Sequence, residues 1–274
     1  PSDVKALVKR GVTVAIQAGA GEASSISDLM YREAGAEIAD NALEAVKDAK
    51  IILVVNAPSF DDLANLSEGS ILVGFLDPLS DLDLVRLLVK SKVTGISMEL
   101  VPRITRAQSM DALSSQATVA GYKAVLLAAG HLPKFLPMLT TAAGTIRPAK
   151  VLILGAGVAG LQAIATARRL GAVVEAFDVR PAVKEQVESL GASFLESEEE
   201  VTAEGEGGYA KELTEDQHNK ELKLIGGALT DTDIAITTAH IPGRRAPVLI
   251  TGEMVKTIQP GSVIVDLASE SGGN

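Results

Sequence analysis

Three glycines with a regular spacing follow an apolar run near the middle of the chain. Gly155, Gly157 and Gly160 form a G-x-G-x-x-G motif that opens an amphipathic stretch. In such a motif the first glycine permits a tight turn, the second lets the backbone approach a pyrophosphate, and the third allows close packing of a helix on a strand. The helix N-terminus adds free N–H groups and a partial positive charge. The motif therefore predicts a binding site for a dinucleotide.

An acidic residue stands where such a site needs a hydrogen-bond acceptor. Asp178 ends the next predicted strand, 18 residues after Gly160, and an acid at this position accepts hydrogen bonds from an adenosine ribose. The same carboxylate repels a 2′-phosphate, which favours NAD(H) over NADP(H), although Arg180 nearby weakens this preference. The alternative is a Rossmann-like domain that packs tightly and binds nothing.

A polar segment follows an earlier predicted strand, over 93–98. Arg103, Gln108, Asp111 and Ser114 lie within it, at the carboxyl edge where open α/β sheets place ligand sites. These side chains are suited to holding a carboxamide and a ribose. The structural alternative is a capped helix start, with Asp111 or Ser114 as the N-cap and Arg103 in a salt bridge. The residues alone leave both interpretations open.

The chain has only three histidines, and their positions bear on the reaction. His131 lies in a loop-rich stretch, and His218 in a charge-dense helical pattern where solvation explains it. His240 follows a predicted strand and is a candidate for lining a cofactor pocket. A dehydrogenase acting on an alcohol or amine needs a placed acid or base, yet no histidine occurs up to Glu99. Hydride passing between two nicotinamide rings needs only positioning.

Short β-rich runs alternate with helical patterns along the whole chain, which indicates an α/β fold with mostly parallel sheets. We expect strands over 12–17, 51–55, 71–75, 93–98, 151–154, 173–177, 233–237 and 262–267. We expect helices over 3–9, 42–48, 81–90, 114–129, 158–170, 182–190, 215–229 and 251–258. We assign residues 1–121 to a first domain and 122–274 to a second, with a loop-rich stretch, 132–148, at the join.

Composition excludes several classes of function. The chain has 274 residues, which favours two domains, and a net charge of −10, which disfavours nucleic-acid binding. Because there are no cysteines, a disulfide scaffold and cysteine-ligated metals are excluded, and we expect no metal site. The longest weakly polar stretch, 151–167, contains three glycines and is shorter than a membrane span.

Several motifs in a fixed order resemble those of the NAD(H)-binding component of the proton-translocating transhydrogenases, over essentially the whole chain. The matching motifs are Pro102-Arg-Ile-Thr-Arg-Ala-Gln-Ser-Met-Asp-Ala-Leu-Ser-Ser, Thr141-Ala-Ala-Gly-Thr, the 155–160 motif, Gly207-Gly-Tyr-Ala-Lys-Glu, Ile241-Pro-Gly-Arg-Arg-Ala-Pro-Val-Leu-Ile and Gly272-Gly-Asn. The resemblance implies two Rossmann-like open parallel-sheet domains with NAD(H) in the cleft between them. It implies a homodimer that docks on an NADP(H)-binding component and a membrane-embedded proton-channel component, at the cytoplasmic side of the inner membrane.

The resemblance also assigns site residues, position by position. On the nicotinamide side it implies Arg103, Ile104, Thr105, Gln108, Asp111 and Ser114, of which Gln108, Arg103 and Asp111 orient the reacting ring. On the nucleotide side it implies Gly155, Gly157, Val158, Gly160, Asp178, Val179, Arg180 and His240. Gly208 and Tyr209 fall in an acidic, glycine-rich stretch, 196–209, that is expected to be mobile and to close over bound nucleotide.

Two departures and two rivals accompany this resemblance. An opening strand before Pro1 and a returning segment after Asn274, both implied by the family, are absent from the sequence. The related alanine dehydrogenases use a lysine and a histidine on their substrate, where this chain has Val54-Val-Asn-Ala-Pro and Val73-Gly-Phe-Leu-Asp. The other rival is a non-catalytic NAD-sensing module, which has no need to orient the nicotinamide end.

Overall fold

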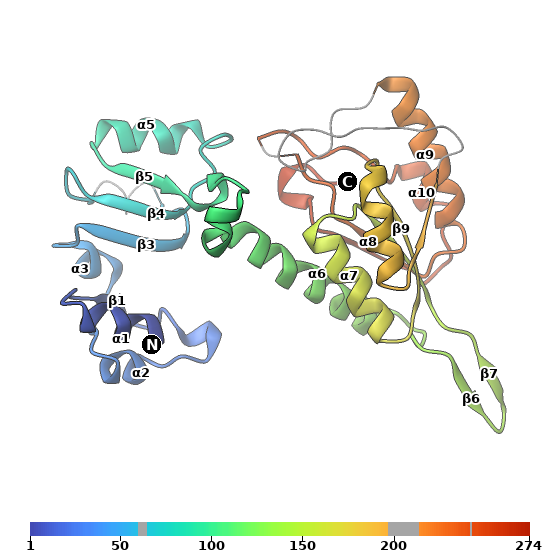
Figure 1. The fold of residues 1–274 in the computed structure, drawn as a ribbon, viewed down its shortest axis with the longest axis horizontal. Coiled ribbons are helices and arrows are strands. Elements are labelled where there is room, and N and C mark those ends of the chain that lie inside the picture. The colour runs from blue at the N-terminus through green and yellow to red at the C-terminus, as the bar shows by residue number, and fades with distance from the viewer. Residues whose placement is uncertain (60–64, 197–213, 242) are drawn as a thin grey trace. The chain divides into compact units, whose positions relative to one another are not determined.

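The computed structural model describes residues 1–59, 65–196, 214–241 and 243–274, and the chain divides into two compact units (Figure 1). These units are Pro1–Met110 and Asp111–Asn274. Apart from one hairpin, the described strand pairs are parallel, so the expected α/β class is confirmed. The division proposed from the sequence, at 121 and 122, falls inside helix α6 (Ala112–His131).

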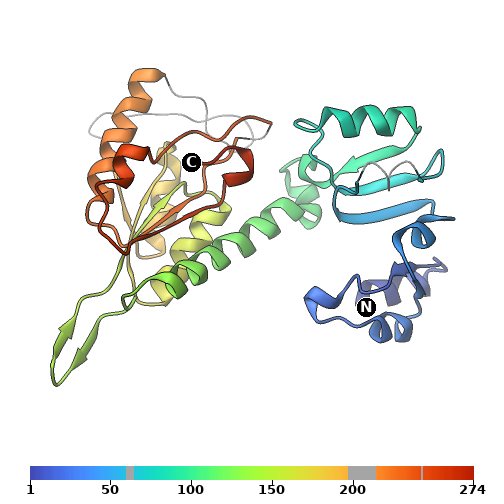
Figure 2. The same cartoon turned by 180° about the vertical axis from the view of Figure 1, so that it is seen from behind.

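The first unit contains a parallel sheet in the order β3 (Ile51–Asn56), β4 (Ile71–Phe75) and β5 (Thr94–Ser97). A separate parallel pair joins β1 (Ala15–Gln17) to β2 (Glu37–Ala39). The helices are α1 (Ser2–Lys9), α2 (Asp28–Glu33), α3 (Ala42–Val46) and α5 (Leu82–Lys90). In both views α5 lies along the three-stranded sheet (Figures 1 and 2).

Only one face of that sheet has an apolar cover. Leu72 of β4 is fully buried and shares a cluster with Leu84 and Leu88 of α5. Side chains alternate between faces along a strand, and on the opposite face of β3 Leu53 and Val55 are 68% and 74% exposed. The core of this unit is therefore one-sided within the described residues.

The second unit is a five-stranded parallel sheet in the order β10-β9-β8-β11-β12. Its strands are β8 (Lys150–Leu154), β9 (Val173–Phe177), β10 (Ser193–Phe194), β11 (Ile234–Thr237) and β12 (Val263–Asp266). Its helices are α6, α7 (Val158–Arg169), α8 (Lys184–Ser189), α9 (Glu215–Leu229) and α10 (Gly252–Val255).

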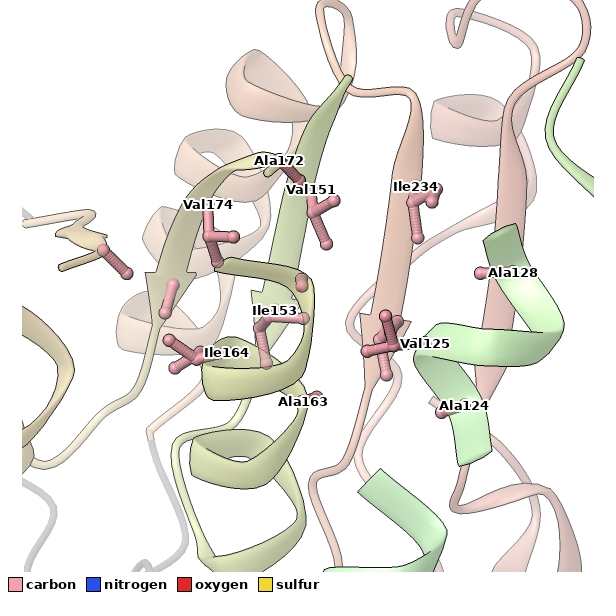
Figure 3. Packing of buried hydrophobic residues seen from close by; sticks show 14 of the residues in the cluster. Ala124, Val125, Ala128, Val151, Ile153, Ala163, Ile164, Ala172, Val174 and Ile234 are labelled. Atoms are coloured by element: carbon pink, nitrogen blue, oxygen red, sulfur yellow. The ribbon is translucent and has the colours of Figure 1, made fainter. Parts of the chain in front are cut away.

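Two apolar layers cover this sheet. Ile153 and Val174 pack with Val125 of α6 and Ile164 of α7 on one face (Figure 3). The alternate strand residues, such as Leu152 and Leu154, pack with α9 on the other face. Buried on both faces, the strands consist almost wholly of aliphatic residues, as central parallel strands do.

Helices α6 and α7 approach each other unusually closely. A Cβ atom at Gly121 of α6 would lie 2.1 Å from the carbonyl oxygen of Ala159 in α7. Only glycine permits this backbone contact, which fixes α6 against the helix that follows the glycine motif.

A β-hairpin occupies part of the stretch expected to be loop-rich. Strands β6 (Leu139–Thr141) and β7 (Gly144–Ile146) pair antiparallel, with Leu139 opposite Ile146. The hairpin projects from the second unit in both views (Figures 1 and 2). Within the described part of the chain, no helix is long and apolar enough to span a bilayer.

Candidate functional site

The glycine motif forms the turn between β8 and α7. Gly155 has φ +100°, a left-handed conformation that favours glycine, and a Cβ atom at Gly160 would lie 1.8 Å from the carbonyl oxygen of Gly155. A Cβ atom at Gly157 would meet nothing within 4 Å. Gly157 is also the N-cap of α7 and supplies no side-chain cap. Space and uncapped helix amides therefore coincide at the position where the motif is expected to admit a pyrophosphate.

Asp178 joins this turn to the end of β9. Its Oδ2 atom accepts a hydrogen bond from the backbone N–H of Ala156 at 2.7 Å. Arg180 donates to the same carboxylate from its backbone N–H at 2.9 Å, from Nε at 2.8 Å and from Nη2 at 2.8 Å. The side chain of Asp178 is only 5% exposed. The acid predicted to bind the ribose therefore also holds the glycine turn, and it does so paired with Arg180.

Thr238, which no sequence motif marked as a candidate, completes the turn. It follows β11, whose neighbour in the sheet is β8. Its hydroxyl donates to the carbonyl oxygen of Gly155 at 2.9 Å, and its backbone N–H donates to the carbonyl oxygen of Leu154 at 2.8 Å. The position after a carboxyl-end strand was the only sequence signal that could have found it.

The turn lies where the strand order reverses. From β8 the chain proceeds to β9 and β10 on one side, whereas β11 and β12 lie on the other side. Open α/β sheets bind ligands at the carboxyl ends of the strands beside such a reversal. Gly155 and Thr238 are both at this point.

Other candidates on the nucleotide side lie near the same edge. Val158 begins α7 and is half-exposed, and Val179 packs against the α9 side of the core. His240 is exposed, with Nδ1 3.2 Å from the hydroxyl of Ser271. Gly208 and Tyr209, with the rest of 197–209, lie outside the described residues.

A buried carboxyl in α9 was not anticipated from the sequence. Glu221 is 7% exposed, and its Oε2 atom lies 3.0 Å from Nδ1 of His218. Burial raises the pKa of Glu221, the hydrogen bond and charge of His218 oppose this, and the charge of Asp178 adds to it. His218 is thus part of a pair, which corrects the interpretation that it is simply solvated.

The polar segment divides between the two units. Arg103, Ile104, Thr105 and Gln108 belong to the first unit, where all are exposed around a short 3-10 helix, Thr105–Met110, anchored by buried Ala107. Asp111 and Ser114 belong to the second unit. Asp111 is the N-cap of α6 and accepts from the backbone N–H of Ser114 at 2.9 Å and from its hydroxyl at 2.7 Å. The capping interpretation of Asp111 is confirmed, and the nicotinamide contacts stay a prediction.

Among the described residues, no group of three or more His, Asp or Glu side chains is arranged to hold a metal ion. What the second unit does contain is a reversing parallel sheet, an open glycine turn and an acid at the next strand end. These features together define a Rossmann-type dinucleotide-binding protein.

Comparison with known proteins narrows this class. The family model for the alanine dehydrogenase/PNT N-terminal domain matches residues 1–120, and that for the alanine dehydrogenase/PNT C-terminal domain matches residues 124–274. The chain is 52% identical over 281 aligned residues to an NAD(P) transhydrogenase subunit alpha of Rhodospirillum rubrum, covering 100% of this chain and 73% of the relative. It is 33% identical to an alanine dehydrogenase of Methanococcus maripaludis, covering 100% of this chain and 68% of that protein.

A solved structure agrees with these sequence matches. The transhydrogenase of Sinorhizobium meliloti has a TM-score of 0.87 and 46% identity, over 100% of this chain and 74% of that one. The chain belongs to the alanine dehydrogenase/PNT family, among the alpha subunits of the NAD(P) transhydrogenases.

Proposed function

We propose that the chain binds NAD(H) at the Gly155–Gly160 turn and passes hydride from NADH to NADP⁺ held by a partner component. The observation that carries the proposal is the open turn at Gly157 beside the carboxylate of Asp178. Membership of the transhydrogenase branch supports NAD(H) as the nucleotide.

The described residues suit the parts of NAD(H) that they would hold. The amides at the start of α7 are suited to the pyrophosphate, and Gly157 leaves room for it. Asp178 accepts ribose hydroxyl hydrogens, while its charge disfavours a 2′-phosphate. The guanidinium of Arg180 lies on Asp178 and reduces that repulsion, so it tempers the selectivity.

The reaction needs positioning rather than proton transfer. Bound NADH supplies a hydride, which leaves with both electrons of its C–H bond and joins the nicotinamide of NADP⁺. Gln108, Arg103 and Asp111 are proposed to orient the donor ring, with Ile104, Thr105 and Ser114 beside them. Such placement alone accounts for large rate effects in reactions between two bound groups.

The proposal extends to assembly. The relatives are named as subunits, which supports a complex with an NADP(H)-binding component and a membrane-embedded component that couples transfer to proton translocation. We include a homodimer of this chain, peripheral on the cytoplasmic side of the membrane through its partners.

A hydride-transfer assay tests the proposal. The purified chain and a purified NADP(H)-binding component are mixed with NADH and an NADP⁺ analogue, together and separately. Transfer that requires both proteins, without an amino acid, supports the proposal. NAD⁺ reduction with alanine by this chain alone would instead indicate an alanine dehydrogenase, and NADH binding without either reaction would indicate a sensing module.

A further inference from the structure

The side chain of Asn274 pairs with the backbone of Ala239. Asn274 Nδ2 donates to the carbonyl oxygen of Ala239 at 2.9 Å, and the N–H of Ala239 donates to Asn274 Oδ1 at 3.0 Å. Nδ2 also donates to the carbonyl oxygen of Pro247 at 2.9 Å. The amide thus imitates a strand neighbour, exchanging two hydrogen bonds with one residue, and it joins two separate parts of the loop after β11.

Asn274 is itself held at the end of β12. Its backbone N–H donates to Asp266 Oδ2 at 3.0 Å. Asp266 Oδ1 accepts from the hydroxyl of Thr237 and from the N–H of Ala268, both at 2.8 Å. Gly273 has φ +83°, and a Cβ atom there would lie 3.0 Å from Asp266 Oδ2. The glycine before Asn274 is therefore needed for this close approach.

The residue before Ala239 contacts the glycine turn directly. Thr238 donates from its hydroxyl to the carbonyl oxygen of Gly155 at 2.9 Å. The same hydroxyl oxygen would lie 2.6 Å from a Cβ atom at Gly155, so the two residues are in tight contact. A shift of Ala239 would therefore move Thr238 and release the turn.

We propose that Asn274 is a positioning residue for the nucleotide site, acting through Ala239 and Thr238 on the turn at Gly155. The inference rests on the proposed function for its consequence in binding, but the coupling itself belongs to the nucleotide-free protein. An amide is required because both carbonyl partners, of Ala239 and Pro247, need a donor. A carboxylate of the same shape would face two carbonyl oxygens and repel them.

Hydrogen exchange in the nucleotide-free protein tests the coupling. Asn274→Asp should speed amide exchange at Thr238 and Ala239 and also at Gly155, whose N–H bonds to the carbonyl oxygen of Phe177. Exchange in the first unit should not change. Asn41→Ala is the matched control, because Asn41 caps α3 by accepting from the N–H of Glu44 at 3.0 Å. Unchanged exchange at Gly155 in Asn274→Asp would overturn the inference.

Titration with NADH tests the consequence. Asn274→Asp should weaken binding on the order of tenfold, the scale of lost and opposed buried hydrogen bonds, whereas Asn41→Ala should lower only the melting temperature. Wild-type affinity in Asn274→Asp, with a lowered melting temperature, would show a merely structural role and overturn the inference.

Two further variants keep the test decisive if Asn274→Asp does not fold. Thr238→Val removes the hydroxyl bond to Gly155 and should weaken binding, and Thr238→Ser should restore it. Equal affinities of these two variants would remove the last step of the coupling and overturn the inference. A wild-type chain that does not bind NADH would contradict the proposed function, while the exchange measurement would still decide the coupling.

Discussion

Asp178 is expected to determine both affinity and selectivity for the nucleotide. Asp178→Ala removes the acceptor for Ala156 and the partner of Arg180, so NADH binding should weaken by about 1–3 kcal/mol. NADPH should lose less, because a like-charge contact disappears with the carboxylate. Fluorescence titration with both nucleotides measures the change. The exposed acid Glu188 of α8 provides the control, as Glu188→Ala. An unchanged ratio of the two dissociation constants would contradict the assignment.

Two glycines of the same turn should respond differently to alanine. At Gly157 a methyl group meets open space, so Gly157→Ala should leave the melting temperature nearly unchanged and weaken NADH binding by blocking the pyrophosphate. At Gly160 the methyl group meets the carbonyl oxygen of Gly155 at 1.8 Å, so Gly160→Ala should destabilise the fold by about 1–3 kcal/mol or more. Thermal unfolding beside nucleotide titration separates the two effects. Tight NADH binding by Gly157→Ala would place the diphosphate elsewhere.

The portion of the site that depends on short sequence separations was predictable. The glycine motif and Asp178 lie within one βαβ unit, where spacing alone implies geometry. Thr238 and Asn274 could not be found in this way. The bond between Thr238 and Gly155 spans 83 positions and exists only because β11 lies next to β8. Such pairing is a property of the sheet order, which local patterns do not encode.

At the scale of elements, α6 offers a matched pair of substitutions. Gly121→Ala should destabilise the second unit by about 1–3 kcal/mol or more, because the new methyl group would lie 2.1 Å from the backbone of Ala159. Gly130 lies on the same helix with nothing near its missing side chain. Gly130→Ala should therefore stabilise by about 0.5–1 kcal/mol through helix propensity. Chemical denaturation measures both, and a tolerated Gly121→Ala would contradict the close packing of α6 on α7.

Helix α9 should make stability depend on pH through Glu221. Burial raises its pKa above the ordinary 4.5, so its contribution is fully present below that value and is lost as pH rises through the folded-state pKa. Glu221→Gln cannot titrate and keeps an acceptor for His218, so the variant should lose less stability between about pH 4 and about pH 8. Urea unfolding across this range is the measurement.

The control for this experiment is an exposed carboxylate. Glu253 pairs with Lys256, and its side chain is 84% exposed. Glu253→Gln should follow the wild-type pH dependence closely. If Glu221→Gln also follows it, the titration of Glu221 does not set the slope.

The longer elements agree with the sequence patterns, and the shorter ones explain where the patterns fail. The strands 71–75 and 173–177 and the helix 215–229 have the expected bounds, because aliphatic runs and helical periodicity extend over enough residues. Strands β2 and β10 have three and two residues, too few to show an alternation. The β6–β7 hairpin has Ala142-Ala143 in its turn instead of an Asn-Gly type of signal, so its sequence predicts a loop rather than paired strands.

At the scale of the whole chain, the proposed tasks divide between the two compact units. The nucleotide anchor, Gly155 with Asp178, belongs to Asp111–Asn274, whereas Gln108 belongs to Pro1–Met110. Within the described residues, hydrogen bonds of its own unit hold the anchor, and the assignment of Gln108 rests on its exposure and on the family resemblance. Binding and transfer should therefore be separable by mutation.

Gln108→Asn should depress hydride transfer far more than it depresses NADH binding. Asparagine keeps the amide and withdraws it by one methylene, so most binding energy remains while the donor ring loses its placement. An error of about 1 Å in such a reaction costs on the order of 100-fold in rate. Asp178→Ala is the converse variant, since it should weaken binding and leave the rate at saturating nucleotide nearly intact. Single-turnover transfer to an NADP⁺ analogue on the partner, beside titrations of both variants, measures the two effects. A wild-type transfer rate in saturated Gln108→Asn would mean that this segment does not position the ring.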